Sequence, residues 1–179
     1  NAVLGIYQTS PGGRFIRVNP AMARILGYRY PEELLAAVGN VSHDVYVEPN
    51  QRREFVRKME VRGVVDSFES KVKQRDGSEI WISEQARAVA DTNGDILYFE
   101  GTVQDVSAQK QSELALKESE QRFRILVQNA PEAIVVFDAD LGRFVDANTN
   151  AEKIYCLSRE ELLETGPIEL SPELQPNGE

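Results

Sequence analysis

Residues 13–35 read GRFIRVNPAMARILGYRYPEELL, and residues 142–163 read GRFVDANTNAEKIYCLSREELL. Both stretches open on GRF, carry an asparagine six residues later (Asn19 and Asn148) and close on EELL. The offset between them is 129 residues at the asparagine and 128 at EELL, so one residue is lost near Tyr30. A period of this length is typical of whole domains and not of solenoid units. The sequence therefore predicts a repeated domain.

A β-hairpin followed by short helices is predicted for the first copy. Strands over Leu4–Thr9 and Arg14–Val18 flank a Pro-Gly-Gly turn. Asn19 is a favoured N-cap, and Pro20 suits the first helical position because its nitrogen has no hydrogen to leave unpaired. Helices are expected over Ala21–Leu26, from Pro31, and from Pro49 to just before Gly63.

Three strands follow in a meander. They are predicted over Val65–Arg75, Glu79–Ala90 and Ile96–Val106, separated by the turn signals Asp76-Gly77 and Asn93-Gly94. A strand pair, several helices and a strand triplet predict an α+β domain built on one antiparallel sheet.

A long helix is predicted after the meander. Residues 107–128 contain no glycine or proline and are rich in Gln, Lys, Glu and Ala, which are good helix formers. The apolar residues are few, and they are Leu114, Leu116, Phe123, Ile125, Leu126 and Val127. So little apolar surface predicts either a short dimer seam or a solvated spacer.

The second copy repeats the hairpin and stops early. Strands are expected over Ile134–Phe137 and Arg143–Ala147, Asn148 caps the next helix, and Ser158 with Glu161 forms a capping box. The tail, through Gly166-Pro167, Pro172, Pro176 and Gly178, is expected to be loop. Because the copy ends where its own meander should begin, we expect a fragment of a longer protein. Its exposed hairpin edge should leave it unstable alone or paired with another chain.

Composition limits the function classes. The 179 residues are 41% apolar, enough for one core of roughly 100 to 120 residues and a smaller one. The net charge of −9 argues against binding to nucleic acid, whose phosphates need a basic surface, and favours a cytoplasmic protein. One cysteine and one histidine exclude an internal disulfide and a zinc site. No apolar run reaches about 18 residues, so no membrane contact by this fragment is expected.

The ordered motifs resemble a PAS domain with its PAC motif, a signalling helix and the start of a second PAS domain. The residues that carry the resemblance are Gly5-Ile6-Tyr7, Gly13-Arg14-Phe15, Asn19-Pro20-Ala21, Leu26-Gly27-Tyr28, Asp76-Gly77-Ser78 with Trp81, Gly94, Gly101-Thr102-Val103 and Asp105-Val106-Ser107. The last triplet is similar to the Asp-Ile-Thr that ends PAS cores. The resemblance implies a five-stranded antiparallel sheet with helices on one face, followed by a long linker helix.

The resemblance also implies a division of the chain and a setting. Residues 1–106 would be a PAS domain lacking its N-terminal helix, 107–130 a signalling linker helix, and 131–179 the N-terminal part of a second PAS domain. Such regions sense a small molecule or join two subunits as a homodimer. They pass the signal to a downstream output domain in a bacterial two-component histidine kinase or a diguanylate cyclase.

No catalytic constellation is present, since a phosphate loop, a nucleophile with its base and paired histidines are all missing from the sequence. PAS relatives that bind haem or flavin hold it through a histidine or a cysteine on the long helix before the meander. Residues 50–62 contain neither, which disfavours both cofactors and leaves the ligand unknown. Cys156 lies in the second copy, where a small buried apolar side chain is expected.

The candidate ligand pocket lies between the sheet and the helices. Period-two alternation assigns Leu97, Phe99, Gly101 and Val103 to the inner face of the last strand, and puts Phe68 and Val72 on one face of the first meander strand. Tyr46, Phe55 and Met59 would roof the space. The polar residues Ser70, Ser83 and Gln85 would fix a ligand if they face inward. An aromatic core closed on itself, without a ligand, is the alternative.

The junction Asp105-Val106-Ser107 is the candidate signal output, with Asp105 as a polar anchor where the sheet becomes the linker. A ligand that moves the strand Ile96–Val106 would pass strain through this junction into the helix at Ser107. The competing hypothesis is a ligand-free dimerisation and spacer module. A cavity with convergent polar groups would favour sensing, and a filled core would favour the spacer.

Overall fold

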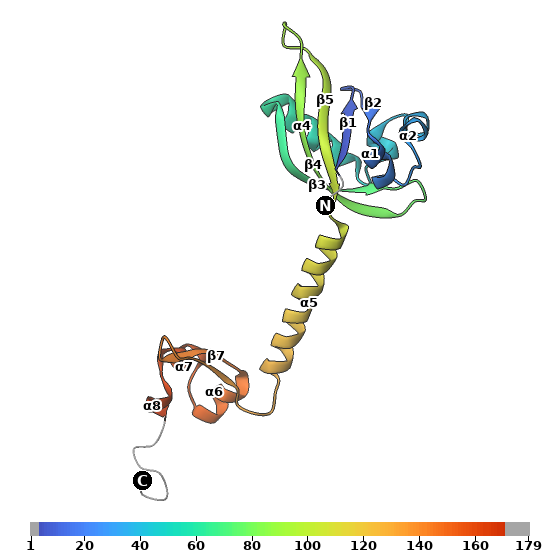
Figure 1. Ribbon diagram of the computed structural model, residues 1–179. Helices are drawn as coiled ribbons and strands as arrows, with labels where there is room; N and C mark the ends of the chain where they lie inside the picture. The colour runs from blue at the N-terminus through green and yellow to red at the C-terminus, as the bar shows by residue number, and fades with distance from the viewer. Residues whose placement is uncertain (1–3, 171–179) are drawn as a thin grey trace, which may run out of the picture. The chain divides into compact units, whose positions relative to one another are not determined.

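The computed structural model describes residues 4–170, and the chain divides after Ser112 into two compact units. Figure 1 shows a curved sheet with helices in the first unit and a hairpin with short helices in the second. The first unit contains β1 (Gly5–Thr9), β2 (Phe15–Val18), α1 (Pro20–Ile25), α2 (Pro31–Ala37), α3 (Val41–Asp44), α4 (Pro49–Arg62), β3 (Val64–Lys73), β4 (Glu79–Ala90) and β5 (Ile96–Asp105). Helix α5 (Ser107–Gln128) begins there. The second unit continues with β6 (Val135–Asp138), β7 (Arg143–Ala147), α6 (Thr149–Tyr155), α7 (Arg159–Glu164) and α8 (Pro167–Leu170).

The sheet of the first unit is five-stranded and antiparallel throughout, in the order β2-β1-β5-β4-β3. Pairing of β1 with β5 joins the hairpin to the meander and places the last strand in the middle of the sheet. The helices cover one face, and the apolar core lies between them and the sheet. The predicted fold class, five antiparallel strands with helices on one face and a long helix after them, is confirmed.

The repeated asparagine has the same structural role in both units. The Asn19 side-chain oxygen accepts from the N–H of Met22 at the start of α1 (2.8 Å) and from the N–H of Ile6 on β1 (2.9 Å). Its amide nitrogen donates to the Leu4 carbonyl at 3.0 Å. Asn148 likewise caps α6, accepts from the segment before β6 and donates to two carbonyl groups. One side chain thus caps a helix and ties it to the hairpin, which explains why the motif recurs.

The glycine of each GRF motif is required by the backbone. Gly13 and Gly142 have φ angles of 84° and 66°, in the left-handed region that disfavours residues with a Cβ. Each lies in the turn that precedes the second strand of its hairpin. The repeat therefore preserves turn geometry as well as the helix cap.

Several predicted details were wrong. Leu97 is exposed because the pairing of β4 with β5 shifts register between Val89 and Ala90, which moves Leu97 off the inner face. The short helix α3 was not predicted, and α8 lies where loop was expected. Cys156 is exposed, since it caps α6 in a left-handed conformation. The expected loop at Pro172, Pro176 and Gly178 lies outside the described residues.

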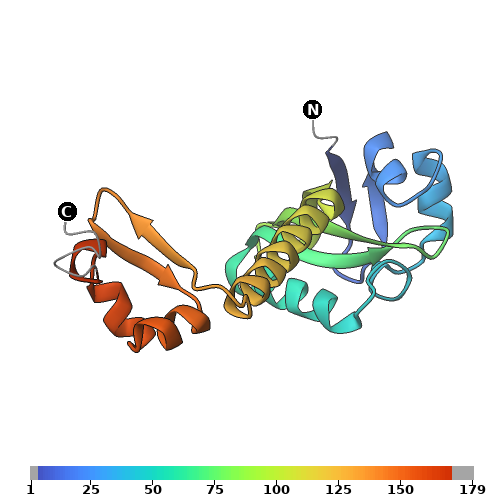
Figure 2. The same ribbon diagram turned by 90° about the horizontal axis from the view of Figure 1, so that it is seen from below.

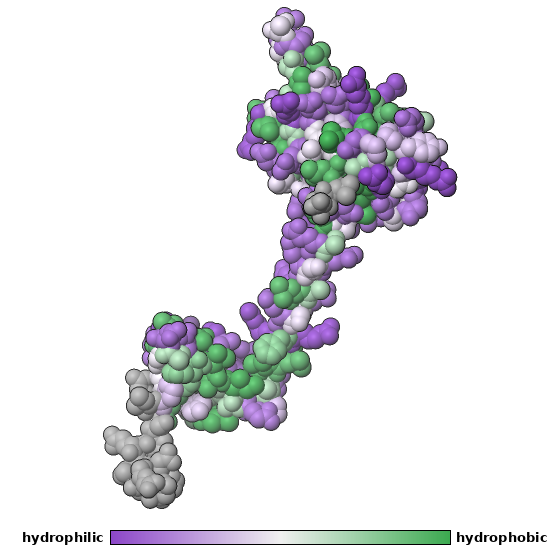
Figure 3. Space-filling model, viewed as in Figure 1, coloured by the Kyte–Doolittle hydropathy of each residue, from purple (hydrophilic) through white to green (hydrophobic). Residues whose placement is uncertain are grey.

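The second unit has a small core. Ala147, Ala151 and Leu162 form its buried apolar cluster, beside a two-stranded sheet. Figure 2 shows the hairpin lying over α6 and α7. Val136, Phe137 and Ile154 are among the apolar side chains left exposed, and apolar patches are visible on this unit in Figure 3.

Candidate functional site

A cluster of polar side chains lies inside the first unit. The buried carboxylate of Glu84 on β4 accepts a hydrogen bond at each oxygen. Tyr46 donates to Oε2 at 2.9 Å, and Tyr7 on β1 donates to Oε1. Arg52 on α4 is also buried, with 4% of its surface exposed. Ionisable side chains are almost never buried in this way unless they are paired, so this cluster identifies the candidate site.

Simple periodicities bring these side chains inward. On β4, the inner positions alternate as Ile82, Glu84 and Ala86, so Glu84 points where its apolar neighbours point. On α4, Arg52 lies three residues before Phe55, whose side chain is fully buried. The apolar residues around Glu84 and Arg52 in the sequence indicate both inward positions, although neither residue was among those predicted for the site.

Burial dominates the electrostatics of the cluster. It raises the pKa of Glu84 above its usual range, against the opposing effects of the Tyr7 hydrogen bond and the Arg52 charge. Burial, followed by the charge of Glu84, also raises the pKa of both Tyr7 and Tyr46 well above the ordinary value for tyrosine. The two tyrosines therefore remain neutral donors at physiological pH, and Glu84 gains a proton more readily than an exposed glutamate does.

The Arg52 guanidinium is surrounded by aromatic rings. Its central carbon lies 4.7 Å from the centre of the Phe55 ring, 5.8 Å from that of Phe99 and 5.9 Å from that of Tyr46. Such cation–π contacts contribute about 1 to 2 kcal/mol each when they are desolvated. Phe55 also contacts Phe68 and Phe99 edge to face, with ring centres 5.7 and 6.1 Å apart.

Polar atoms in this core remain without partners. Among the described residues, Thr9 Oγ1, Arg52 Nη2 and Ser70 Oγ are buried and form no hydrogen bond. A cavity of about 20 Å³ is lined by Thr9, Tyr46, Arg52 and Glu84 together with apolar side chains. A space of this size admits about one water molecule. The interior is therefore almost filled, yet its hydrogen-bonding capacity is incomplete.

Most of the sequence-predicted pocket residues do lie inside the first unit. Eight of them are buried there, namely Tyr46, Phe55, Met59, Phe68, Ser70, Val72, Phe99 and Val103. Of these, Tyr46, Val72 and Val103 line the cavity. The residues that the prediction missed are Tyr7, Thr9, Arg52 and Glu84.

Two of the remaining three predicted residues, Ser83 and Gln85, do not face the core. They alternate with the buried residues Ile82 and Glu84 on β4, so the inward orientation considered for them was wrong. Gly101 keeps the predicted inward register, since it pairs with the buried residues Tyr7 and Ala86, but its backbone is partly exposed and also lines a hollow on the opposite face of the sheet. Small polar side chains were a misleading signal on β4, where the apolar period of Ile82 and Ala86 marks the inner positions.

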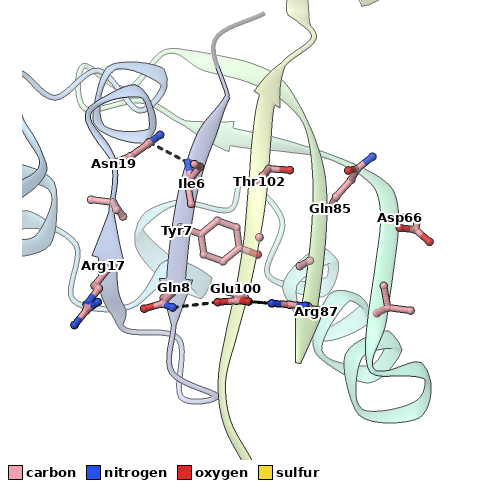
Figure 4. Close-up of a pocket in the computed structure, with 14 residues that line it drawn as sticks. Ile6, Tyr7, Gln8, Arg17, Asn19, Asp66, Gln85, Arg87, Glu100 and Thr102 are labelled. Carbon is pink, nitrogen blue, oxygen red and sulfur yellow. Dashed lines mark hydrogen bonds and ion pairs between the residues drawn. The ribbon is translucent and has the colours of Figure 1, made fainter. Parts of the chain in front are cut away.

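The opposite face of the sheet carries a larger, open hollow of about 680 Å³ (Figure 4). Three of its polar side chains bond to one another. Gln8 donates to Glu100 at 3.1 Å, and Arg87 donates to the same carboxylate at 2.5 and 2.8 Å. These hydrogen bonds from Arg87 lower the pKa of Glu100. We place the candidate site in the interior, where buried polar atoms lack partners and cannot reach solvent.

The predicted signal junction is tied to the sheet. The Ser107 N–H donates to Asp105 Oδ1, and the Trp81 N–H on β4 donates to Ser107 Oγ, both at 2.9 Å. The Val106 N–H donates to the Trp81 carbonyl, also at 2.9 Å. Trp81 therefore connects the buried cluster to the start of α5, since it lies three residues before Glu84 on β4.

The described residues offer neither a metal site nor a membrane-spanning helix. Between residues 4 and 170, no three His, Cys, Asp or Glu side chains gather so as to hold a metal ion. No helix in the same range combines the length and apolar character needed to span a bilayer.

Comparison with known proteins agrees with this architecture. A PAS domain family profile matches residues 2–108, and a second PAS domain profile matches residues 121–179. The first match covers more than half of the chain, which therefore belongs to the PAS domain family. PAS domains are sensory and non-catalytic.

Individual relatives are more distant. The uncharacterized protein y4lL of Sinorhizobium fredii is 28% identical over 130 residues, which are 73% of this chain and 15% of that protein. Sporulation kinase E of Bacillus subtilis is 38% identical over 66 residues, 37% of this chain and 9% of the kinase. A sensory box histidine kinase/response regulator structure from Burkholderia thailandensis superposes with a TM-score of 0.52 at 24% identity, covering 70% of this chain and 93% of that one. The chain thus spans a small fraction of its sequence relatives.

Proposed function

We propose that this chain is the sensory region of a larger signalling protein. Its first unit binds a small molecule between the sheet and the helices, and α5 carries the resulting change toward a downstream output domain. The PAS family membership supports a sensing role, and the histidine kinase and sporulation kinase among its relatives support a kinase as parent. A diguanylate cyclase remains the alternative parent.

The observation that carries this proposal is the incomplete polar cluster in the core. A domain that serves only as a spacer gains nothing from a buried arginine and two buried hydroxyls without partners, because each unsatisfied group costs about 1 to 3 kcal/mol. Such strained polar sites are characteristic of binding sites, where a ligand completes the hydrogen bonds.

The route to the output runs through β4 as well as β5. Glu84 and Trp81 share β4, and Trp81 is hydrogen-bonded to Val106 and Ser107 at the root of α5. On the edge strand β3, Glu69 lies 2.6 Å from Lys110 on the first turns of α5. A displacement of β4 or β3 relative to β5 would therefore change how α5 begins, which extends the proposed junction at Asp105-Val106-Ser107 to a second strand.

The division of the chain is part of the same proposal. Residues 1–106 form the sensing domain, 107–130 the linker and 131–179 the beginning of a second PAS domain, each without catalytic activity. The acidic net charge of −9 supports a cytoplasmic location and disfavours nucleic acid as a partner.

A ligand-free dimerisation and spacer module is the second candidate. It is favoured by the small volume of the interior cavity, about 20 Å³, and by the exposed apolar side chains of α5. Leu116, Phe123 and Leu126 are each more than half exposed, and a matching helix from a second copy would cover them.

Native mass spectrometry of the purified chain, compared with its denatured mass, separates the two candidates. Extra mass that is lost on denaturation supports the sensing role, and an absorption spectrum would identify a coloured cofactor. A dimer of bare chains, with no ligand extracted by organic solvent, would support the spacer and contradict the proposed binding.

A further inference from the structure

Among the described residues, Arg52 carries a buried charge that has no ion pair within 4.0 Å and one hydrogen-bond donor without a partner. Arg52 as a residue is 96% buried, and its Nη2 has no hydrogen-bond partner. Within residues 4–170, Arg52 forms no ion pair, since no carboxylate oxygen lies within 4.0 Å of it. The faces of three aromatic rings offset part of the desolvation cost but accept no hydrogen bond in the plane of the guanidinium. The N–H groups of Nη2 therefore lack an acceptor.

The nearest buried carboxylate is already used. Each oxygen of Glu84 accepts from a tyrosine, Tyr7 or Tyr46. Both Glu84 and Arg52 line the cavity, but they do not bridge it. The guanidinium of Arg52 thus lies at the wall of the cavity as a hydrogen-bond donor. Its two parallel N–H groups have the geometry that suits a second carboxylate.

A hydroxyl group completes the donor set. Thr9 Oγ1 lines the same cavity as Arg52, is 99% buried and has no partner. A hydroxyl can donate to one oxygen of a carboxylate while a guanidinium donates to the other. Ser70 Oγ is also unpartnered in this core, although Ser70 is not among the residues that line the cavity.

The rest of the cavity wall is apolar. Phe15, Met22, Val41 and Val45 line it and have no charge to offer a ligand. An inorganic anion would make no favourable contact with these apolar side chains, whereas a short hydrocarbon tail would pack against them. Met22 is an unbranched, flexible side chain, and α3, which Val41 begins, is a single short turn beside the cavity.

The charge of a bound anion can be accommodated. Burial raises the pKa of Glu84, so its neutral form is accessible when a second negative charge enters. The other titratable groups that face Glu84 are Tyr7 from β1, Tyr46 from the segment between α3 and α4, and Arg52 from α4. The tyrosines stay neutral, so Arg52 and the anion form the central pair.

We propose that the interior site takes a small aliphatic monocarboxylate, whose carboxylate pairs with Arg52 and accepts a hydrogen bond from Thr9. This assignment rests on the proposed sensing function and specifies its ligand class. The small cavity limits the ligand to a short chain, and binding opens the site between α3 and the sheet.

The test uses the whole 179-residue chain and three matched probes: propionate, the neutral propionamide and the cationic propylammonium. Binding is measured by calorimetry and by the thermal midpoint, followed through the fluorescence of Trp81. Propionate is expected to bind and raise the midpoint, whereas the amide and the ammonium ion of similar size should not.

Two variants and one control locate the site. Arg52→Gln should weaken propionate binding by about tenfold or more, because a hydrogen bond to a charged group is worth at least that factor. Thr9→Val keeps the volume but removes the hydroxyl, and should weaken binding about three- to tenfold even if Arg52→Gln fails to fold. Arg53→Gln removes the same charge from the exposed neighbouring position and should leave binding unchanged.

The outcomes separate this inference from the proposed function. Binding of propionamide or propylammonium in preference to propionate would overturn the carboxylate assignment while keeping an interior small-molecule site. Equal loss of propionate binding in Arg53→Gln would place the anion on the surface and also overturn it. If no probe binds and native mass spectrometry finds no ligand, both proposals fall.

Discussion

Gly101 offers the sharpest test of how the sheet is packed. It lies on the central strand β5, paired with Tyr7 on β1 and with Ala86 on β4. A Cβ built at this position would lie 2.9 Å from the Cβ of Ala86 and 3.0 Å from its Cα, and closer still to the carbonyl oxygen of Gln85. Carbon atoms normally approach to about 3.5 Å, so β4 and β5 would have to separate by about 0.6 Å.

The cost of Gly101→Ala follows from this geometry. The clashing atoms belong mainly to the backbone of a strand held on both sides, so no side chain can rotate away. Overpacking of this kind costs about 3 kcal/mol, and the lower entropy of alanine in the unfolded chain returns about 0.5 to 1 kcal/mol. We therefore expect a net loss of about 2 kcal/mol and a thermal midpoint lowered by about 8 to 10 °C.

Urea unfolding followed by tryptophan fluorescence measures this loss, because Trp81 is the only tryptophan and lies in the same unit. Gly12→Ala is the matched control. The nearest atom to its added Cβ is Ser10 Oγ at 3.8 Å, and its φ lies outside the left-handed region. If Gly101→Ala unfolds within about 0.5 kcal/mol of Gly12→Ala, the inferred close approach of β4 and β5 is wrong.

Three further predictions follow from single side chains. Because burial raises the pKa of Glu84, the folded state holds a proton that the unfolded state has released, and the free energy of unfolding should fall as pH rises from about 4.5 through the raised pKa. Glu84→Gln should flatten this dependence on pH, measured by urea unfolding across that range. An unchanged slope in the variant would contradict the role of Glu84. Asn19→Ala removes three hydrogen bonds and should lower the free energy of unfolding by about 2 kcal/mol in the same assay. Asn19→Asp keeps the acceptor that caps α1 and should lower it by less, so equal losses of stability would refute the capping role. Ser107→Ala should speed amide exchange at Trp81, measured by NMR, while Ser112→Ala further along α5 should not.

The repeat and the alternation of apolar residues predicted much of the fold. Local signals were sufficient for α4, which begins at Pro49 and ends before Gly63, and for β4 and α5, whose bounds were predicted correctly. These elements depend on proline, glycine and periodicity, which act over a few residues. The short helix α3 was missed because a single turn gives no periodic signal.

The candidate site was predicted only in part. Phe55, Phe68 and Phe99 were assigned inward correctly, since large apolar residues must be buried somewhere. Ser83 and Gln85 were considered as inner polar groups, whereas Glu84 holds that position. A charged residue in a core runs against the usual partition of charge to the surface, so composition alone argued against the correct choice.

The domain repeat, the order of strands and helices, and the asparagine caps follow from the amino-acid sequence alone, because each depends on residues close together along the chain. The pairing of β1 with β5 and the meeting of Tyr7, Tyr46, Arg52 and Glu84 depend on the tertiary structure. These residues come from four separate segments, and their contacts form only when the sheet closes over the helices. Burial then shifts the pKa of Glu84 and leaves Arg52 Nη2 without an acceptor, and no single segment has these properties.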